Sequence, residues 1–170
     1  MNFEMAAEMA RDEDNIEVDY VVVNDDIAVE DSTWTEGRRG VAGTVLVHKI
    51  VGAVAENGAS LAEVKETADR VNANLASLGL ALSAATTPES GKKGFELEDD
   101  EIEFGIGIHG EPGYRKEKLH TAHEMVGEFY EKIKKELELS NESEVVVLVN
   151  GMGATPLMEQ YVFVNDVLNR

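Results

Sequence analysis

Hydrophobic positions along the chain alternate between the spacing of helices and that of strands. Phe3, Ala6, Ala7 and Ala10 share one face of a helix, whereas residues 18–23 form a run of strand length that is rich in β-branched residues. This alternation between helical and strand spacing continues to the C-terminus. They predict helices over residues 3–10, 41–55, 61–75, 118–139 and 157–169, and strands over residues 18–23, 77–85, 101–108 and 145–149.

Three segments make the expected packing more specific. The runs 18–23 and 145–149 are largely apolar without alternation, which is typical of strands covered on both faces. Residues 41–55 are apolar on nearly every side, which predicts a buried helix. Ser60 and Glu63 have the spacing of a capping box at the start of the next helix. Together, the elements predict the α/β class, a mixed sheet with helices packed on it.

The composition limits the class of protein and its partners. With 170 residues and 43% hydrophobic content, the chain can form one ordinary core, and without cysteine it has neither disulfides nor a thiol nucleophile. Its longest apolar stretches are far shorter than the roughly 20 residues that cross a bilayer, and its acidic N-terminus is unlike a targeting signal. The net charge of −19 disfavours nucleic acid as a partner. We therefore expect a cytoplasmic protein that binds neither nucleic acid nor membrane.

The strongest candidate for chemistry is one histidine in a glycine-rich segment. Residues 101–108 alternate between polar and apolar, as a half-buried strand does, and lead directly to His109. Four glycines and a proline within residues 105–113 give this loop a specified shape. A neutral imidazole is nucleophilic, and histidine changes its charge near neutral pH. The alternative is a tight turn whose histidine only binds a neighbouring backbone group.

Three other features have weaker functional interpretations. Residues 150–156 join a strand to a helix through two glycines, a geometry that can bind an anion, and a simple tight turn is an equal alternative. His120 and His123 share a helix face, but no third metal ligand accompanies them, which favours a solvated flank. His48 is expected to bond to Thr44 or to a nearby carbonyl within the buried helix. We therefore expect no metal site.

Four segments, taken in order, closely resemble the dihydroxyacetone kinase family, and more narrowly its substrate-binding subunit, called K. The similarity runs from about residue 1 to residue 170. The segments are residues 39–49 (RGVAGTVLVHK), 77–83 (SLGLALS), 105–113 (GIGIHGEPG) and 150–156 (NGMGATP). The resemblance implies the end of the first domain and most of the second domain of a K subunit. Residues 1–35 would be the remnant of an N-terminal α/β domain, and residues 36–170 the histidine-bearing α/β domain.

The resemblance also implies a role for the histidine segment. The family's histidine, which matches His109, forms a covalent hemiaminal with the ketone carbon of dihydroxyacetone, so His109 is the expected catalytic residue. His109, Gly110 and Glu111 are the expected substrate-binding residues, and Glu111 is a candidate for orienting the ring. Addition to a carbonyl distinguishes a keto sugar from a polyol such as glycerol by chemistry rather than by shape.

Cofactors and partners are implied by the same resemblance. In the family, a separate L subunit binds the phosphoryl donor, ADP or ATP with magnesium, and in the phosphotransferase version an M phosphocarrier recharges it. We therefore expect no cofactor or metal on this chain, dihydroxyacetone as its substrate, an L subunit and possibly M as its partners, and a homodimer as its assembly.

Two family motifs are missing from the sequence. The first half of a family member carries a glycine-serine-glycine-histidine-glutamate-proline stretch and a threonine-glycine-aspartate motif, which supply an acid/base histidine and a catalytic aspartate; neither occurs here. We expect a central portion of a K subunit that keeps the covalent anchor but has no kinase activity alone, with apolar surface exposed around residues 18–23. The alternatives are a dihydroxyacetone-sensing paralogue that acts as coactivator of a transcription regulator, and an inactive remnant.

Overall fold

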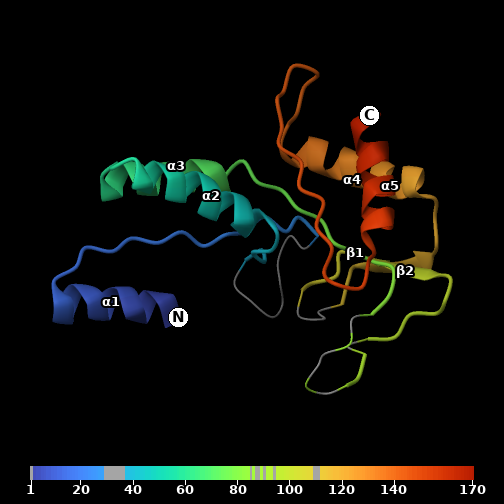
Figure 1. Ribbon diagram of the computed structural model, residues 1–170, viewed down its shortest axis with the longest axis horizontal. Coiled ribbons are helices and arrows are strands. Elements are labelled where there is room, and N and C mark those ends of the chain that lie inside the picture. Colours follow the sequence, from blue (N-terminus) through green and yellow to red (C-terminus); the bar gives the residue numbers. More distant parts are fainter. Residues whose placement is uncertain are drawn as a thin grey trace.

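A small antiparallel sheet and the helices beside it organise the protein (Figure 1). The structure, a computed structural model, describes residues 2–28, 37–84, 86, 89, 91–93, 95–108 and 112–170. Mixed helices and strands within these residues confirm the predicted α/β class. In chain order they are α1 (Asn2–Asp14), α2 (Gly43–Glu56), α3 (Leu61–Asn72), β1 (Leu80–Ala81), β2 (Glu101–Phe104), β3 (Arg115–Lys118), α4 (Ala122–Glu136) and α5 (Leu157–Leu168).

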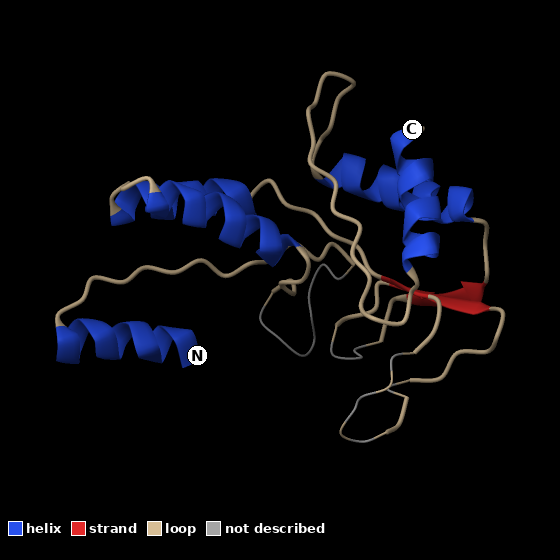
Figure 2. Ribbon diagram, in the orientation of Figure 1, coloured by secondary structure: helices blue, strands red, loops and turns tan. Residues whose placement is uncertain are grey.

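The sheet has the order β1-β2-β3, with both neighbouring pairs antiparallel. Phe104 of the central strand lies opposite Leu80 on one side and Arg115 on the other. A parallel pairing outside these strands joins Asp26 to Ser77 as an isolated bridge. Figure 2 shows α4 and α5 together on one side of the sheet, so this side holds the core.

The hydrophobic core lies where β2 meets α4 and α5. Ile102, Phe104 and Met125 are buried at its centre, with partly buried apolar side chains around them. The ring of Phe129 on α4 lies edge-on to Phe104, with 6.0 Å between the centroids, and to Phe163 of α5, at 5.5 Å. Because aromatic pairs favour this edge-to-face geometry, the three rings join the sheet to both helices.

The helices α2 and α3 form an antiparallel pair that lies apart from the sheet and is joined to it by loops (Figure 1). The predicted capping box is confirmed: the Glu63 backbone N–H donates to the Ser60 side chain, and the Ser60 backbone N–H donates to the Glu63 carboxylate. The prediction that α2 is buried is wrong. Only Gly43 and Val47 are buried in it, and Ile50 is 44% exposed. The helix α2 is apolar on all sides, but α3 is the described helix that packs on it. Because α3 covers one side of α2, the other apolar sides are left exposed.

Two predicted strands are absent from the described structure. Residues 18–23 and 145–149 contain no assigned strand, and Val22 is 66% and Val146 78% exposed. A β-branched run indicates which side chains favour burial, but a strand also needs a neighbouring strand that satisfies its backbone groups. Among the described residues, neither run is paired with another strand. The expected exposure of apolar surface around residues 18–23 is therefore confirmed.

Other boundaries shift for local reasons. The predicted strand over residues 101–108 ends at Phe104, because Gly105 turns the chain with a φ of 76°. The helix predicted from residue 118 begins at Ala122, because Arg115–Lys118 pairs with β2 and Thr121 forms a second capping box with Glu124. No helix of the described residues has the length and apolar character that crossing a bilayer requires.

Candidate functional site

The predicted site lies in the connection between β2 and β3. His109, Gly110 and Glu111 are outside the described residues, so their roles stay predictions. The structure does describe both flanks of the segment, residues 105–108 and 112–113. The site can therefore be built from the groups that hold these two flanks.

Gly105 forms the first flank and is held on both of its backbone groups. Its N–H donates to the carbonyl of Gly79 at 2.7 Å, and its carbonyl accepts from Nη2 of Arg39 at 2.9 Å. The positive φ disfavours any side chain here. A Cβ would also lie only 2.7 Å from Cε1 of Tyr114, whose ring packs against the turn. Glycine is therefore required at this position.

Gly113 forms the second flank and binds back to β2. Its N–H donates to Oε1 of Glu103 at 2.7 Å, and the next N–H, of Tyr114, donates to the carbonyl of Phe104 at 2.9 Å. Glu103 is only 2% exposed, although the alternation of residues 101–108 predicted a half-buried strand with polar side chains outward. That prediction is wrong for Glu103, because its carboxylate turns to the loop backbone and has Nζ of Lys116 at 3.8 Å.

Two adjacent buried aspartates, Asp25 and Asp26, bind the start of α2 and the side chain of Arg39. The carboxylate of Asp25 accepts from the N–H groups of Val41 and Gly43, both at 2.8 Å, at the start of α2. A carboxylate is stabilised there by the free N–H groups and the positive end of the helix dipole. The carboxylate of Asp26 accepts from the backbone N–H of Ala28 at 3.0 Å and from Nε of Arg39 at 2.7 Å.

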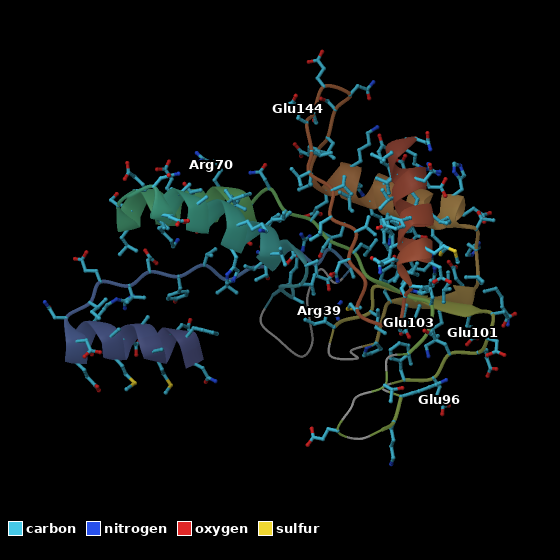
Figure 3. The ribbon with its side chains drawn as sticks, viewed as in Figure 1. Arg39, Arg70, Glu96, Glu101, Glu103 and Glu144 are labelled. Atoms are coloured by element: carbon cyan, nitrogen blue, oxygen red, sulfur yellow. The ribbon has the colours of Figure 1, made fainter. Side chains whose placement is uncertain are left out.

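Sequence reasoning missed these aspartates as functional positions. Both are buried, at 0% and 2% exposure. The available signal was the pair of consecutive carboxylates that follows the apolar run 18–23 after a single asparagine. Figure 3 shows Arg39, the partner of Asp26, near the middle of the molecule, with Glu103 on the strand nearby.

A second polar cluster lies behind Tyr114. Its hydroxyl donates to Oε1 of Glu128 at 2.9 Å and accepts from Nζ of Lys132 at 2.6 Å. Nη2 of Arg115 donates to the other oxygen of Glu128 at 2.5 Å. Burial and the hydrogen bond to Glu128 raise the pKa of Tyr114, so the hydroxyl stays protonated. The cluster ties the residue that follows the loop to α4.

Replacing Glu128 by glutamine is expected to weaken the acid dependence of stability. Burial raises the pKa of Glu128, but the hydrogen bonds from Arg115 and Tyr114 outweigh it and leave the pKa below 4.5. Such a group contributes stability above its unfolded-state pKa and loses it as the pH falls through the folded-state value. Urea unfolding at decreasing pH below 4.5 should therefore show a smaller loss of unfolding free energy in Glu128→Gln than in the wild type. Glu131→Gln, exposed on the same helix, should follow the wild type, and parallel profiles for all three proteins would contradict the expectation.

The remaining histidines lie on the surface, as far as the described structure extends. His120 is near the carboxylates of Glu117 and Glu124, at 3.3 and 3.7 Å, and His123 is exposed. The exposure predicted for His120 and His123 is confirmed, but the prediction that they share a helix face is wrong, because α4 begins at Ala122 and His120 precedes its N-cap. The described residues contain no cluster that could hold a metal ion. His48 is exposed, so its predicted place inside a buried helix is wrong.

The glycine turn at residues 150–156 leads into α5, as predicted. Pro156 stands at the N-cap of α5 rather than within its first turn. Gly153 has a φ of 103°, and Nε2 of Gln160 donates to the carbonyl of Thr155 at 2.9 Å, which closes the turn internally. The turn is thus accounted for by its own contacts, and anion binding stays a prediction.

Comparison with known proteins identifies the family. Residues 1–170 match the Dak1 domain. A relative from Listeria innocua serovar 6a, named PTS-dependent dihydroxyacetone kinase 1, dihydroxyacetone-binding subunit DhaK, is 64% identical over 98% of this chain and 50% of its own length. The structure of a dihydroxyacetone kinase operon co-activator, DhaQ, matches with a TM-score of 0.88 and 41% identity, over 98% of this chain and 51% of its own. The dihydroxyacetone kinase of C. freundii in its native form matches with a TM-score of 0.88 and 33% identity, over 99% of this chain and 30% of its own.

The matches cover nearly all of this chain but only part of each relative. The chain spans about half the length of the curated relatives that it matches. The Dak1 match extends over every residue of the chain, and the fold agrees with solved structures of the same group. The chain belongs to the Dak1 domain family.

Proposed function

We propose that this chain is part of the substrate-binding subunit of a dihydroxyacetone kinase and that His109 anchors the substrate as a hemiaminal. The observation that carries the proposal is the 64% identity to a dihydroxyacetone-binding subunit over nearly the whole chain. Two features of the described residues support it. The histidine segment is bounded by two glycines whose backbone groups are fixed by hydrogen bonds, and these bonds use charged groups that are largely buried.

The proposed chemistry is a reversible addition. The unprotonated nitrogen of the imidazole bonds to the central carbon of dihydroxyacetone, and the C=O double bond becomes a C–OH group. The oxygen gains one proton, and the other ring nitrogen gives one up, so nothing is oxidised or reduced. Gly110 and Glu111 are the proposed neighbours in substrate binding, with Glu111 as the group that orients the ring.

Carbon NMR with dihydroxyacetone labelled at its central carbon tests this proposal. The carbon signal should move from the ketone region to that of a tetrahedral carbon bonded to oxygen and nitrogen. Glycerol labelled in the same position, which has no carbonyl, should show no shift when added to the protein. A labelled ketone signal that stays unchanged at saturating protein concentration would refute the proposal.

Phosphoryl transfer would require partners. We propose that an L subunit that holds ADP or ATP with magnesium supplies the phosphoryl group, which leaves from ATP, and that an M phosphocarrier recharges the resulting ADP where a phosphotransferase chain is the source. This chain would contribute substrate positioning rather than nucleotide or metal binding. Assembly as a homodimer in the cytoplasm belongs to the same proposal.

A second candidate function is supported by the structural match to the operon co-activator DhaQ. Such a protein would bind dihydroxyacetone and activate a transcription regulator without transferring phosphate. Because both functions use the same adduct, adduct formation alone does not distinguish them.

Joining the chain to the unmatched part of the Listeria innocua subunit should distinguish the two functions. This chain alone, with a competent L subunit, is expected to show no phosphorylation of dihydroxyacetone. The joined protein should phosphorylate it if the kinase proposal holds, and its His109→Ala variant should not. A joined protein that forms the adduct but transfers no phosphate would favour the coactivator.

A further inference from the structure

Arg39 connects a buried carboxylate to the backbone where the histidine segment begins. Its Nε donates to Oδ2 of Asp26 at 2.7 Å, and its Nη2 lies 2.6 Å from the same oxygen. The same Nη2 donates to the carbonyl of Gly105 at 2.9 Å. The side chains of Arg39 and Asp26 are only 11% and 3% exposed.

The guanidinium suits this double contact because it is planar and carries several donors in fixed directions. One edge binds the carboxylate, and Nη2 also reaches the carbonyl of Gly105. A lysine ammonium keeps the charge but lacks this fork, so it would not hold both partners in the same geometry.

The opposite flank is held in a complementary way. There the acceptor is a side chain and the donor is backbone: Glu103, 2% exposed, receives the N–H of Gly113. Burying charged groups costs free energy unless they are paired and hydrogen-bonded. The protein thus uses a buried cation at one end of the segment and a buried anion at the other, and each fixes one backbone group.

We propose that Arg39 is a positioning residue for the adduct at His109. By holding the carbonyl of Gly105 against the Asp26 carboxylate, Arg39 orders this flank before the imidazole bonds to a ketone, so that less ordering is left to occur on binding. Preorganisation of this kind strengthens binding by lowering the cost of ordering. The inference rests on the proposed function and names a group outside the histidine segment on which that function depends.

The test compares two adjacent arginines in the full chain. Arg39→Lys and Arg39→Gln should weaken the adduct with labelled dihydroxyacetone by about tenfold or more, the loss that about 1.4 kcal/mol of ordering cost would cause. Arg38→Gln is the matched control, because the Arg38 guanidinium pairs with Glu136 of α4. Its adduct affinity should equal that of the wild type.

Stability is measured alongside to separate positioning from folding. Urea unfolding gives the free energy of each variant, and Arg39→Lys combined with Gly52→Ala tests whether restored stability restores the adduct. The inference expects that it does not. Wild-type adduct affinity in folded Arg39→Lys, recovery through Gly52→Ala, or loss of folding in both Arg39 variants would overturn it. Absence of the adduct in the wild type would instead refute the proposed function.

Discussion

Replacing His109 by alanine is expected to abolish the covalent adduct with dihydroxyacetone. The proposed bond joins the central carbon of the sugar to an imidazole nitrogen, and alanine has no group that can replace it. The carbon signal of labelled dihydroxyacetone should then stay in the ketone region at every protein concentration. Because the sequence predicts a loop at His109, the unfolding free energy should change by less than about 0.5 kcal/mol.

The control for this experiment is another histidine of the same chain. His48→Ala removes an imidazole that is exposed on α2, and it should leave the carbon signal of the adduct unchanged. An adduct that persists in His109→Ala and disappears in His48→Ala or His120→Ala would move the nucleophile to another position. An adduct that persists in all of these variants would exclude histidine chemistry at the three sites.

Replacing Gly105 by alanine is expected to cost more stability than the same change at Gly52 or Gly58. The positive φ costs about 1–2 kcal/mol for any residue with a Cβ, and forced overlap in a packed region typically costs about 1–3 kcal/mol more. At Gly105 a Cβ would meet the Tyr114 ring and would lie 2.9 Å from Cβ of Ala28. Urea unfolding measures the sum of the backbone cost and the overlap cost as a loss of unfolding free energy.

The three other glycines separate the two causes. Gly58 has a φ of 86° and open space around it, so its alanine variant measures the backbone cost alone. Gly113 has no positive φ, and a Cβ there would overlap the backbone carbonyl oxygen of Phe104 and lie 2.8 Å from its carbon, so its variant measures overlap with fixed backbone. Gly52 lies inside α2 with nothing nearby, and Gly52→Ala should stabilise by about 0.5–1 kcal/mol. Equal losses for Gly58→Ala and Gly105→Ala would show that the packing of Tyr114 is irrelevant.

Local signals in the sequence were sufficient to predict the elements whose start or periodicity is set by residues within the element itself. The capping box at Ser60 and the helical apolar spacing of α4 predict helices that the structure contains. Elements that depend on distant partners were not predictable in this way. Arg115–Lys118 has no apolar residue and becomes a strand only through pairing with β2, whereas residues 145–149, four valines and a leucine, find no strand partner among the described residues.

The candidate site was predictable to the same extent. The glycines at 105 and 113 indicated a shaped loop, and their backbone contacts explain why glycine is needed. Arg39 and Glu103 gave no such signal, because charged residues are usually exposed and their burial results from long-range pairing. Arg39 and Gly105, for example, are 66 positions apart.

The exposed valines of residues 145–149 have a consequence for the colloidal behaviour of the protein. An exposed apolar segment whose backbone pairs with no strand, as holds for this run among the described residues, is a template for intermolecular β-pairing. The net charge of −19 opposes such association, because like-charged molecules repel before the segments meet. Salt shortens the range of this repulsion to about 10 Å at 0.1 M ionic strength. Self-association should therefore become easier as salt is added, and the acidic surface acts as the barrier that keeps these edges apart.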